Sequence, residues 1–207
     1  MIEIDAKGLQ QLSRTLQALP EESAKASMRA INYAAKRART LGGRKIREQV
    51  NLKAPYVNEQ LKVSRFATLQ KPEAVISARH RPVRLARYNA RQLTRRGPYA
   101  KGDPLRKISA GRVQAGVSVK VKKGGQTRRM RKAFLVPLRR GKMPGDSSHM
   151  GIFIRTGKDR KAIRHLYGPS VNQVFRSVRD DINPSIRQDL AAEYGRQLDL
   201  AFNRRRR

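Results

Sequence analysis

The stretch from residue 133 to residue 178 constrains the fold more than any other part of the chain. Two short apolar runs, residues 133–138 and 151–155, are bounded by turn residues, a pattern that predicts two strands. Gly157 and the Gly168-Pro169 pair then mark turns before a different periodicity begins. The stretch is therefore predicted to fold as strand, tight turn and extended segment, leading into a helix.

The start of that helix has the pattern of a capping box. Ser170 can accept a hydrogen bond from a free amide of the first turn, while Gln173, three residues later, can reach back to the cap. Val171, Val174, Phe175 and Val178 then mark one helical face.

This tract resembles the prophage minor tail protein Z family, the tail-completion proteins of long-tailed bacteriophages. The resemblance rests on a phenylalanine-containing strand that runs into an Arg-x-Gly-Lys-x-Arg turn and then a Leu-Tyr-Gly-Pro-Ser-Val turn. It extends to the N-terminal half, where an Ile-x-Ile strand is followed by a Leu-Pro break and an Ala/Arg-rich helix ending near residues 51–53. The structural motif comprises Arg155, Gly157, Lys158, Tyr167, Gly168, Pro169 and Ser170.

The resemblance implies a structural virion protein rather than an enzyme. The resemblance implies that the protein completes the phage tail and connects it to the head at the neck. Copies of the chain are expected to form a ring for this purpose, and a hexamer is the preferred ring. The expected partners are tail tube or tail terminator proteins, head-side connector proteins and genomic DNA. No contact with a membrane is expected. The expected location is the virion tail or neck, after assembly in the host cytoplasm.

Charge points independently to an anionic partner. Residues 61–170 contain 29 basic and 4 acidic side chains, and so carry +25 of the net charge of +33. Such a charge repels itself in a compact state unless an anion or solvent offsets it. Phosphate backbones are common partners of basic surfaces, and binding to them depends on salt.

We expect three long basic loops, at about residues 89–112, 122–132 and 139–150, to carry much of this charge, and these loops have too few apolar residues to order themselves. Interleaved acids, normal on a merely solvated surface, are almost absent there. The terminal run 204–207 is expected to be a disordered basic end. The candidate polyanion-binding residues are Arg91, Arg95, Arg96, Lys122, Lys123, Arg128, Arg129, Arg131, Lys132, Arg139 and Arg140.

The predicted fold class is α+β, a single domain over residues 1–207 in which N-terminal and C-terminal helices pack on an antiparallel sheet. Strict alternation from Arg112 to Val121 predicts a strand with one buried face, which could form a meander with strands 133–138 and 151–155. We expect a strand at residues 1–5, a small leucine-striped helix at 9–19, and a longer helix from Pro20 with a kink or break at Gly42-Gly43. A short helical turn is expected at 55–61, and Asn183-Pro184 is expected to begin the last helix.

The sequence offers little for catalysis. It has no cysteine, and its three histidines (His80, His149 and His165) are scattered without the spacing of a metal site. Asp180-Asp181 fits a helix start better than a nuclease, which would need several converging carboxylates. We expect no enzymatic activity, no metal and no cofactor. Gly124-Gly125 and Gly157-Lys158 lack the spacing of phosphate-binding loops and are interpreted as hairpin turns.

Two alternatives remain beside the virion protein. A stand-alone nucleic-acid-binding protein would place exposed aromatic side chains beside basic ones for stacking, and the few aromatic residues fall mostly on apolar faces. A metal nuclease is disfavoured by the missing carboxylates. No run approaches the length of a membrane span, and residues 1–5 lack the form of a secretion signal, so we expect a product of the cytosol.

Overall fold

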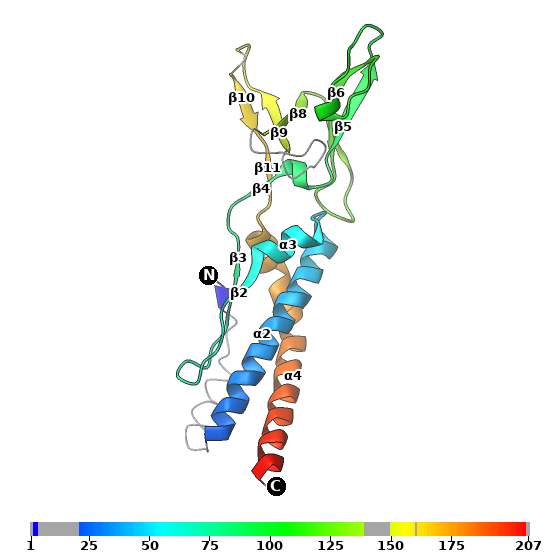
Figure 1. Cartoon of the computed structure of the whole chain (residues 1–207). Coiled ribbons are helices and arrows are strands. Elements are labelled where there is room, and N and C mark those ends of the chain that lie inside the picture. The colour runs from blue at the N-terminus through cyan, green and yellow to red at the C-terminus, as the bar shows by residue number, and fades with distance from the viewer. Residues whose placement is uncertain (1, 4–20, 139–149, 160, 206–207) are drawn as a thin grey trace. The chain divides into compact units, whose positions relative to one another are not determined.

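The computed structural model describes residues 2–3, 21–138, 150–159 and 161–205 (Figure 1). The chain divides into two compact units. The first comprises Met1–Ile46, Val57–His80 and Val171–Arg207, and the second comprises Arg47–Tyr56 and Arg81–Ser170. Every registered strand pair is antiparallel, and long helices lie toward both ends of the sequence, which confirms the α+β class. That the two units form one domain stays a prediction.

Two long helices, α2 (Glu21–Gln49) and α4 (Val171–Arg205), lie side by side in the first unit (Figure 1). Small residues repeat every fourth position on the buried face of α2, which allows another element to approach closely. They are Ala26, Ala30, Ala34, Ala38 and Gly42. At Gly42 the partner is the ring of Phe175 in α4, whose Cε2 would lie 2.7 Å from a Cβ added to the glycine.

This contact explains why Gly42 occurs inside α2. Helix α2 is helical through Gly42 and Gly43, so neither glycine ends it. Glycine weakens a helix interior, but here the missing Cβ provides the space that Phe175 fills. The predicted helix is confirmed and is unbroken at this pair, while a kink there stays a prediction.

Helix α4 is longer than expected. We expected separate helices after Ser170 and at Asn183, but a single helix runs from Val171 to Arg205 with Pro184 inside it. Proline removes one helical hydrogen bond. The apolar stripe continues across it, because Ile182 and Ile186 on either side are both buried. Asp180 and Asp181 therefore lie within a helix and not before one, which corrects their interpretation as a helix start.

The first unit also contains a small sheet with strand order β1 (Ile2–Glu3), β3 (Val75–Ala78) and β2 (Leu61–Arg65). Strand β2 directly follows the short helix α3 (Ala54–Gln60). Asn32 of α2 fixes the segment after β2, since its side chain donates to Ala67 O at 3.0 Å and accepts from Ala67 N at 2.8 Å.

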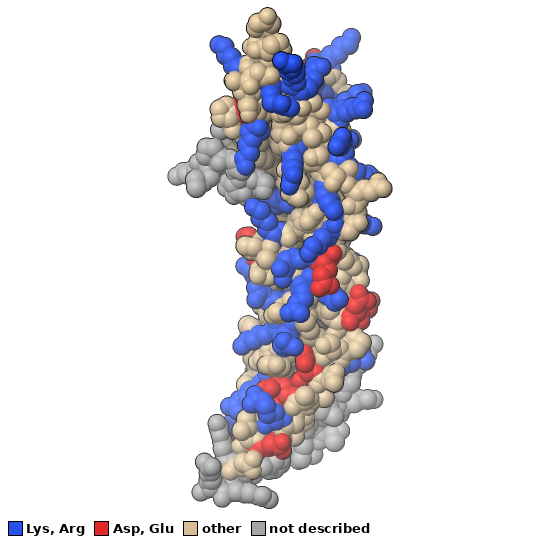
Figure 2. Space-filling model, turned by 90° about the vertical axis from the view of Figure 1, so that its right-hand side faces the viewer, with Lys and Arg blue, Asp and Glu red and all other residues tan. Residues whose placement is uncertain are grey.

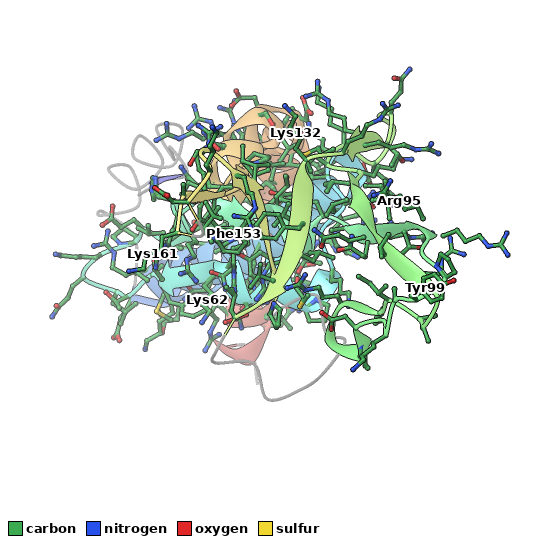
Figure 3. All side chains as sticks on the ribbon, turned by 90° about the horizontal axis from the view of Figure 1, so that it is seen from above. Lys62, Arg95, Tyr99, Lys132, Phe153 and Lys161 are labelled. Atoms are coloured by element: carbon green, nitrogen blue, oxygen red, sulfur yellow. The ribbon has the colours of Figure 1, made fainter. Side chains whose placement is uncertain are left out.

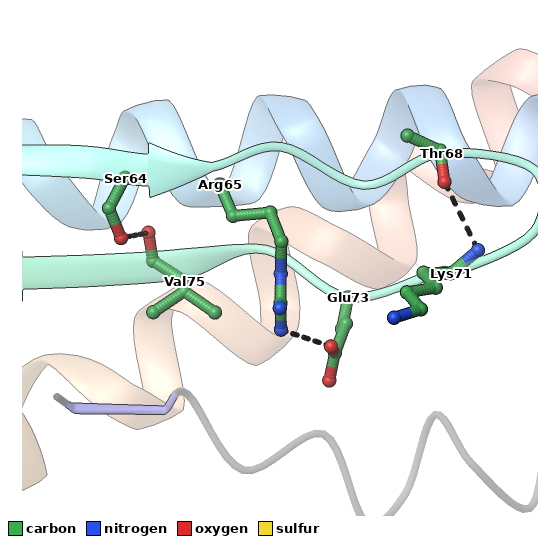
Figure 4. A network of polar contacts seen from close by, with 6 residues as sticks. All are labelled: Ser64, Arg65, Thr68, Lys71, Glu73 and Val75. Carbon is green, nitrogen blue, oxygen red and sulfur yellow. Dashed lines mark hydrogen bonds and ion pairs between the residues drawn. The ribbon is translucent and has the colours of Figure 1, made fainter.

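Polar side chains also stabilise the β2–β3 connection (Figure 4). Ser64 Oγ donates to Val75 O at 3.1 Å, and Lys71 N donates to Thr68 Oγ1 at 3.1 Å. Arg65 forms an ion pair with Glu73. Glu73, the acidic residue within this connection, is therefore paired inside the connection itself.

The described residues of the second unit form three small sheets instead of one. Their strand orders are β5-β6-β7, β10-β9-β8 and β11-β4. Their bounds are β4 (Val83–Arg84), β5 (Arg91–Arg96), β6 (Arg112–Val119), β7 (Arg128–Met130), β8 (Ala133–Pro137), β9 (Met150–Arg155), β10 (Ile163–His165) and β11 (Tyr167–Gly168), with short 3-10 turns η1 (Leu85–Arg87) and η2 (Pro104–Arg106).

The predicted strands are confirmed, but the predicted meander is wrong. Strand β8 pairs with β9 as expected, whereas β6 pairs with β5 and β7 in a different sheet. The short strand β7 takes the edge of β6 that β8 was expected to occupy. Strict alternation also fails in the second half of β6, because Gly116, Val117, Ser118 and Val119 are all buried.

Two of the expected basic loops are partly ordered. Strand β5 and turn η2 lie in the first, and strand β7 lies in the second. Helix α4 includes Arg204 and Arg205, so the expected disordered end is helical up to that point. The predicted helix at 9–19 and the loop residues 139–149 lie outside the described residues.

Candidate polyanion-binding ribbon

The candidate site is the three-stranded sheet β5-β6-β7, called the basic ribbon below. Its register places Arg91 of β5 opposite Ser118 of β6, and Ser118 opposite Arg129 of β7. The two arginines therefore flank one serine in a row across the sheet. Further along, Arg96 and Arg112 are directly opposite each other, and all four arginines are exposed.

Like charges in directly opposite positions destabilise an antiparallel pair. The sheet lies wholly within the described residues, and none of its registered pairs contains an aspartate or glutamate that could offset this repulsion. One arginine is partly accommodated, since Arg112 Nε donates to Thr94 Oγ1 at 2.7 Å. The arrangement is suited to an anion bound from outside the chain.

Backbone hydrogen bonds order the connection between β5 and β6, despite its shortage of apolar residues. Gly97 N donates to Gly111 O at 2.9 Å, and Gly111 N donates to Ala100 O at 2.8 Å. Deeper in the connection, Asp103 N donates to Ile108 O at 2.7 Å. Asp103 also caps η2, where its side chain accepts from Arg106 N and lies 3.2 Å from Arg106 Nε. The acid of this segment is thus used internally.

The structure brings together only some of the predicted residues. Arg91, Arg95 and Arg96 lie on β5, and Arg128 and Arg129 lie on β7, in one sheet. Lys122 forms an isolated bridge with Val50, and Lys123 N donates to Gln49 O at 2.9 Å, so both follow β6 outside the sheet. Arg131 and Lys132 lie in the turn before β8, and Arg139 and Arg140 lie outside the described residues.

Arg112 is a ribbon residue that the candidate set omitted. The signal was present, because the alternation of the β6 segment already placed Arg112 on its polar face. On the face drawn in Figure 2, lysine and arginine side chains are dense over the second unit, and acidic side chains gather over the long helices.

The Tyr-Gly-Pro-Ser motif has a structural role in the second unit. Strand β11 pairs with β4, and an added Cβ on Gly168 would lie 2.6 Å from Cε2 of the buried Tyr88. The Tyr88 hydroxyl donates to Pro169 O at 2.5 Å. Burial raises the pKa of the Tyr88 phenol, with a smaller contribution from Tyr56. The glycine is therefore required for close packing against a tyrosine, and Ser170 follows it as a buried residue.

The Arg-x-Gly-Lys part of the motif is a hairpin turn, as predicted. It joins β9 to β10, where Thr156 N donates to Ala162 O at 2.9 Å and Ala162 N donates to Asp159 O at 3.1 Å. Arg155 Nη1 donates to Asp159 O at 3.5 Å. Gly124-Gly125 likewise lies in the connection between the antiparallel strands β6 and β7.

A row of rings crosses the sheet β10-β9-β8 and continues to Tyr167 of β11. The ring centroids of Phe134 and Phe153 lie 6.3 Å apart, those of Phe153 and His165 lie 4.5 Å apart, and those of His165 and Tyr167 lie 4.5 Å apart. Gly151 leaves the space for this row, since its added Cβ would lie 2.6 Å from Phe153 Cε2. Burial, and secondarily the charge of Arg84, lowers the pKa of His165. The rings pack on one another, which gives His165 a structural explanation.

The described residues hold no group of three or more His, Cys, Asp or Glu side chains that could bind a metal ion. Of the other histidines, His80 Nδ1 lies 3.0 Å from Asn172 Nδ2, and His149 lies outside the described residues. None of the helices in the described part of the chain is long and apolar enough to cross a membrane.

Comparison with known proteins agrees with the resemblance seen in the sequence. The model of the prophage minor tail protein Z family matches residues 6–205, nearly the whole chain. No curated protein and no solved structure matches. Because the match covers far more than half of its length, the chain belongs to the prophage minor tail protein Z family.

Proposed function

We propose that this protein completes the tail of a long-tailed bacteriophage at its head-side end, as a structural component without enzymatic activity. The carrying observation is the family match over residues 6–205, which assigns a phage tail protein. In this proposal, copies of the chain form a ring, with six as the preferred number. The ring joins the tail tube or tail terminator proteins to the head-side connector proteins.

The basic ribbon supplies the contact to a polyanion in this proposal. In a joint between tail and head the available polyanions are the end of the genome and acidic rims of neighbouring proteins. The opposed pair Arg96–Arg112 and the row Arg91–Ser118–Arg129 support such a contact, because their mutual repulsion is relieved when an anion binds. Ring formation also brings copies of the same ribbon nearer one another, which strengthens the need for a shared anion.

The test compares two charge-matched variants of the full chain. The ribbon variant carries Arg91→Gln, Arg96→Gln, Arg112→Gln and Arg129→Gln. The control variant carries Arg29→Gln, Arg44→Gln, Arg176→Gln and Arg187→Gln, which removes the same charge from exposed positions on α2 and α4.

Duplex-DNA affinity is measured for both variants over a range of salt concentrations. For the ribbon variant the slope of log affinity against log salt should flatten by about 0.9 for each DNA phosphate that the variant no longer neutralises, and particles should fail to join heads or to retain DNA. The control should keep most of its slope and join normally. Equal slopes in the two variants, together with normal joining, would reject a DNA contact at the ribbon.

The ring and its place are tested separately by a map of the protein in purified particles. A closed ring at the head-side end of the tail is the expected result. A location along the tail shaft or at its distal tip would overturn the neck assignment while leaving the tail role intact.

A further inference from the structure

Tyr99 is 98% exposed, although it lies in an ordered part of the second unit. The other large apolar side chains that are exposed in the described residues have exposed fractions between 39% and 53%, so each rests partly on the protein. Nothing in the described part of the chain covers the ring of Tyr99. It lies on the same hairpin as Arg95, and both are labelled in Figure 3.

The backbone that carries Tyr99 is held firmly. Ala100 N donates to Gly97 O at 2.9 Å, which closes a turn over Pro98 and Tyr99, and proline fixes its own backbone angle in such a turn. Gly97 and Ala100 are each hydrogen-bonded to Gly111, the turn residue just before β6. An added Cβ on Gly97 would lie 2.8 Å from Cγ1 of Val113, so the base of the turn is closely packed.

A rigid turn that presents one aromatic side chain loses little conformational entropy when that side chain is buried by a partner. Basic residues flank this turn in the sequence, with Arg95 and Arg96 before it and Lys101 after it. Tyrosine and arginine are among the residue types enriched at the energetic centre of protein interfaces. The partner surface that fits this turn has an apolar pocket for the ring and carboxylates around it for the cations.

We propose that the turn Gly97–Ala100 is a docking finger, and that Tyr99 enters an apolar pocket with an acidic rim on another virion protein. This deepens the proposed function, on which it rests for the identity of the partner as a virion component. A second copy of the chain is a poor occupant, since it would bring the same cations to the contact. Duplex DNA is also a poor occupant, because its bases are already stacked and an aromatic wedge must unstack them.

The central variant is Tyr99→Ala, studied in the full chain. Because the ring is 98% exposed, the melting temperature should not change. The functional readout is the protein concentration that gives half-maximal head joining when purified protein is added to particles that lack it. That concentration should rise by roughly tenfold to a hundredfold, the range expected for an interface anchor.

Two further variants make the result specific. Tyr99→Phe keeps the ring and should stay within about twofold of wild type, given that the ring supplies most of the contact. Tyr33→Ala removes a tyrosine of α2 that is 41% exposed, and should join normally. Normal joining by Tyr99→Ala would overturn the finger.

Duplex-DNA binding separates this proposal from the ribbon. Tyr99→Ala should keep the wild-type affinity and salt slope, whereas the ribbon variant should not. If the ribbon variant binds and joins normally while Tyr99→Ala fails to join, the DNA contact is rejected and the finger stands. If DNA affinity falls in Tyr99→Ala in proportion to joining, the turn is a nucleic-acid contact and the finger is overturned.

A photoreactive phenylalanine derivative at position 99 identifies the occupant in assembled particles. A crosslink to an acidic segment of a different virion protein is the expected product. Crosslinks to DNA or to a second copy of the chain would overturn the proposal, as would the absence of any protein crosslink in particles that join normally.

Discussion

In the first unit, α2 buries a stripe of alanine and glycine, and Gly42 of this stripe packs against Phe175 of α4, whereas the β5–β6 connection of the second unit is ordered by backbone hydrogen bonds around glycines. The difference extends to charge. On the helices, Arg37 pairs with Asp189 and Arg196 pairs with Glu193. In the basic ribbon, arginine faces arginine across the sheet.

This comparison indicates which charged side chains are available to bind a partner. The Arg37–Asp189 pair is partly exposed and so contributes little stability, but both pairs place an acidic neighbour beside a cation. The registered pairs of the ribbon contain no acidic residue. Its hairpin is ordered by backbone hydrogen bonds, so its exposed arginines are not needed for packing. A binding surface can therefore change there with little effect on folding, while the helices tolerate little change where they pack together.

The largest expected effect is on the helix packing of the first unit. Phe175→Ala should lower the free energy of unfolding by about 3–5 kcal/mol, as expected when a large buried ring is deleted and a cavity is left, because Phe175 is only 2% exposed. Chemical denaturation measures this free energy of unfolding. Tyr99→Ala, which removes an exposed ring, is the control and should cost almost nothing. A decrease below about 1 kcal/mol for Phe175→Ala would show that this ring does not hold the helices together.

A smaller decrease is expected where α2 meets the β2–β3 hairpin. Ala35 is buried in a cluster with Ile31, Ala67 and Ala74, against which Leu190 also packs. Ala35→Leu should overpack this cluster and destabilise the protein by about 1–3 kcal/mol. The same change at exposed Ala191 of α4 is the control. Unchanged melting in Ala35→Leu would mean that the cluster opens easily to admit a larger side chain.

Tyr88 tests the hydrogen-bonded packing of the second unit. Tyr88→Phe removes the donor to Pro169 O and should lower the free energy of unfolding by about 1 kcal/mol at neutral pH. Since burial raises the Tyr88 pKa, the folded state favours the protonated phenol. The resulting stability is complete below the ordinary tyrosine pKa of about 10 and is lost as the pH rises above it.

The pH dependence supplies the check on Tyr88. Wild-type stability should fall as the pH rises above about 10, and the difference from Tyr88→Phe should shrink over the same range. Tyr99→Phe makes the same chemical change at an exposed site and should follow wild type throughout. A constant difference between Tyr88→Phe and wild type would contradict the buried, protonated phenol.

Local sequence patterns predicted most helices and strands. The remaining elements and pairings depend on tertiary contacts. Alternation identified β6, and the apolar runs identified β8 and β9, because these signals are written in neighbouring residues. The pairing of β6 with β7 was missed, since Arg128–Met130 has no apolar alternation and becomes a strand only by adding to an existing edge. Pro184 was taken for a helix start because sequence alone cannot show that Ile182 and Ile186 are buried on the same helix.

The candidate site followed the same division. The basic character of the middle segment was visible in the sequence, and so were most of the cations that the ribbon carries. Their register was not visible, so the opposition of Arg96 and Arg112 and the inclusion of Arg112 came only from the structure. The exposure of Tyr99 also depended on how its turn is tied to Gly111, a contact across the hairpin that no local pattern encodes.

The smallest expected effect has the opposite sign and tests the comparison most directly. Arg96→Gln should raise the free energy of unfolding by a few tenths of a kcal/mol, because it removes a like charge directly opposite Arg112. Arg95→Gln is the matched control, since it deletes the same charge from the adjacent position, which is opposite Val113 and has no such repulsion to relieve. Both changes should weaken duplex-DNA binding to a similar degree. The stability increase of Arg96→Gln should shrink as salt is added, because salt screens exposed charges. If the increase persists at high salt, or if Arg95→Gln shows it too, then it does not come from repulsion between Arg96 and Arg112. The ribbon would then hold no repulsion for a bound anion to relieve.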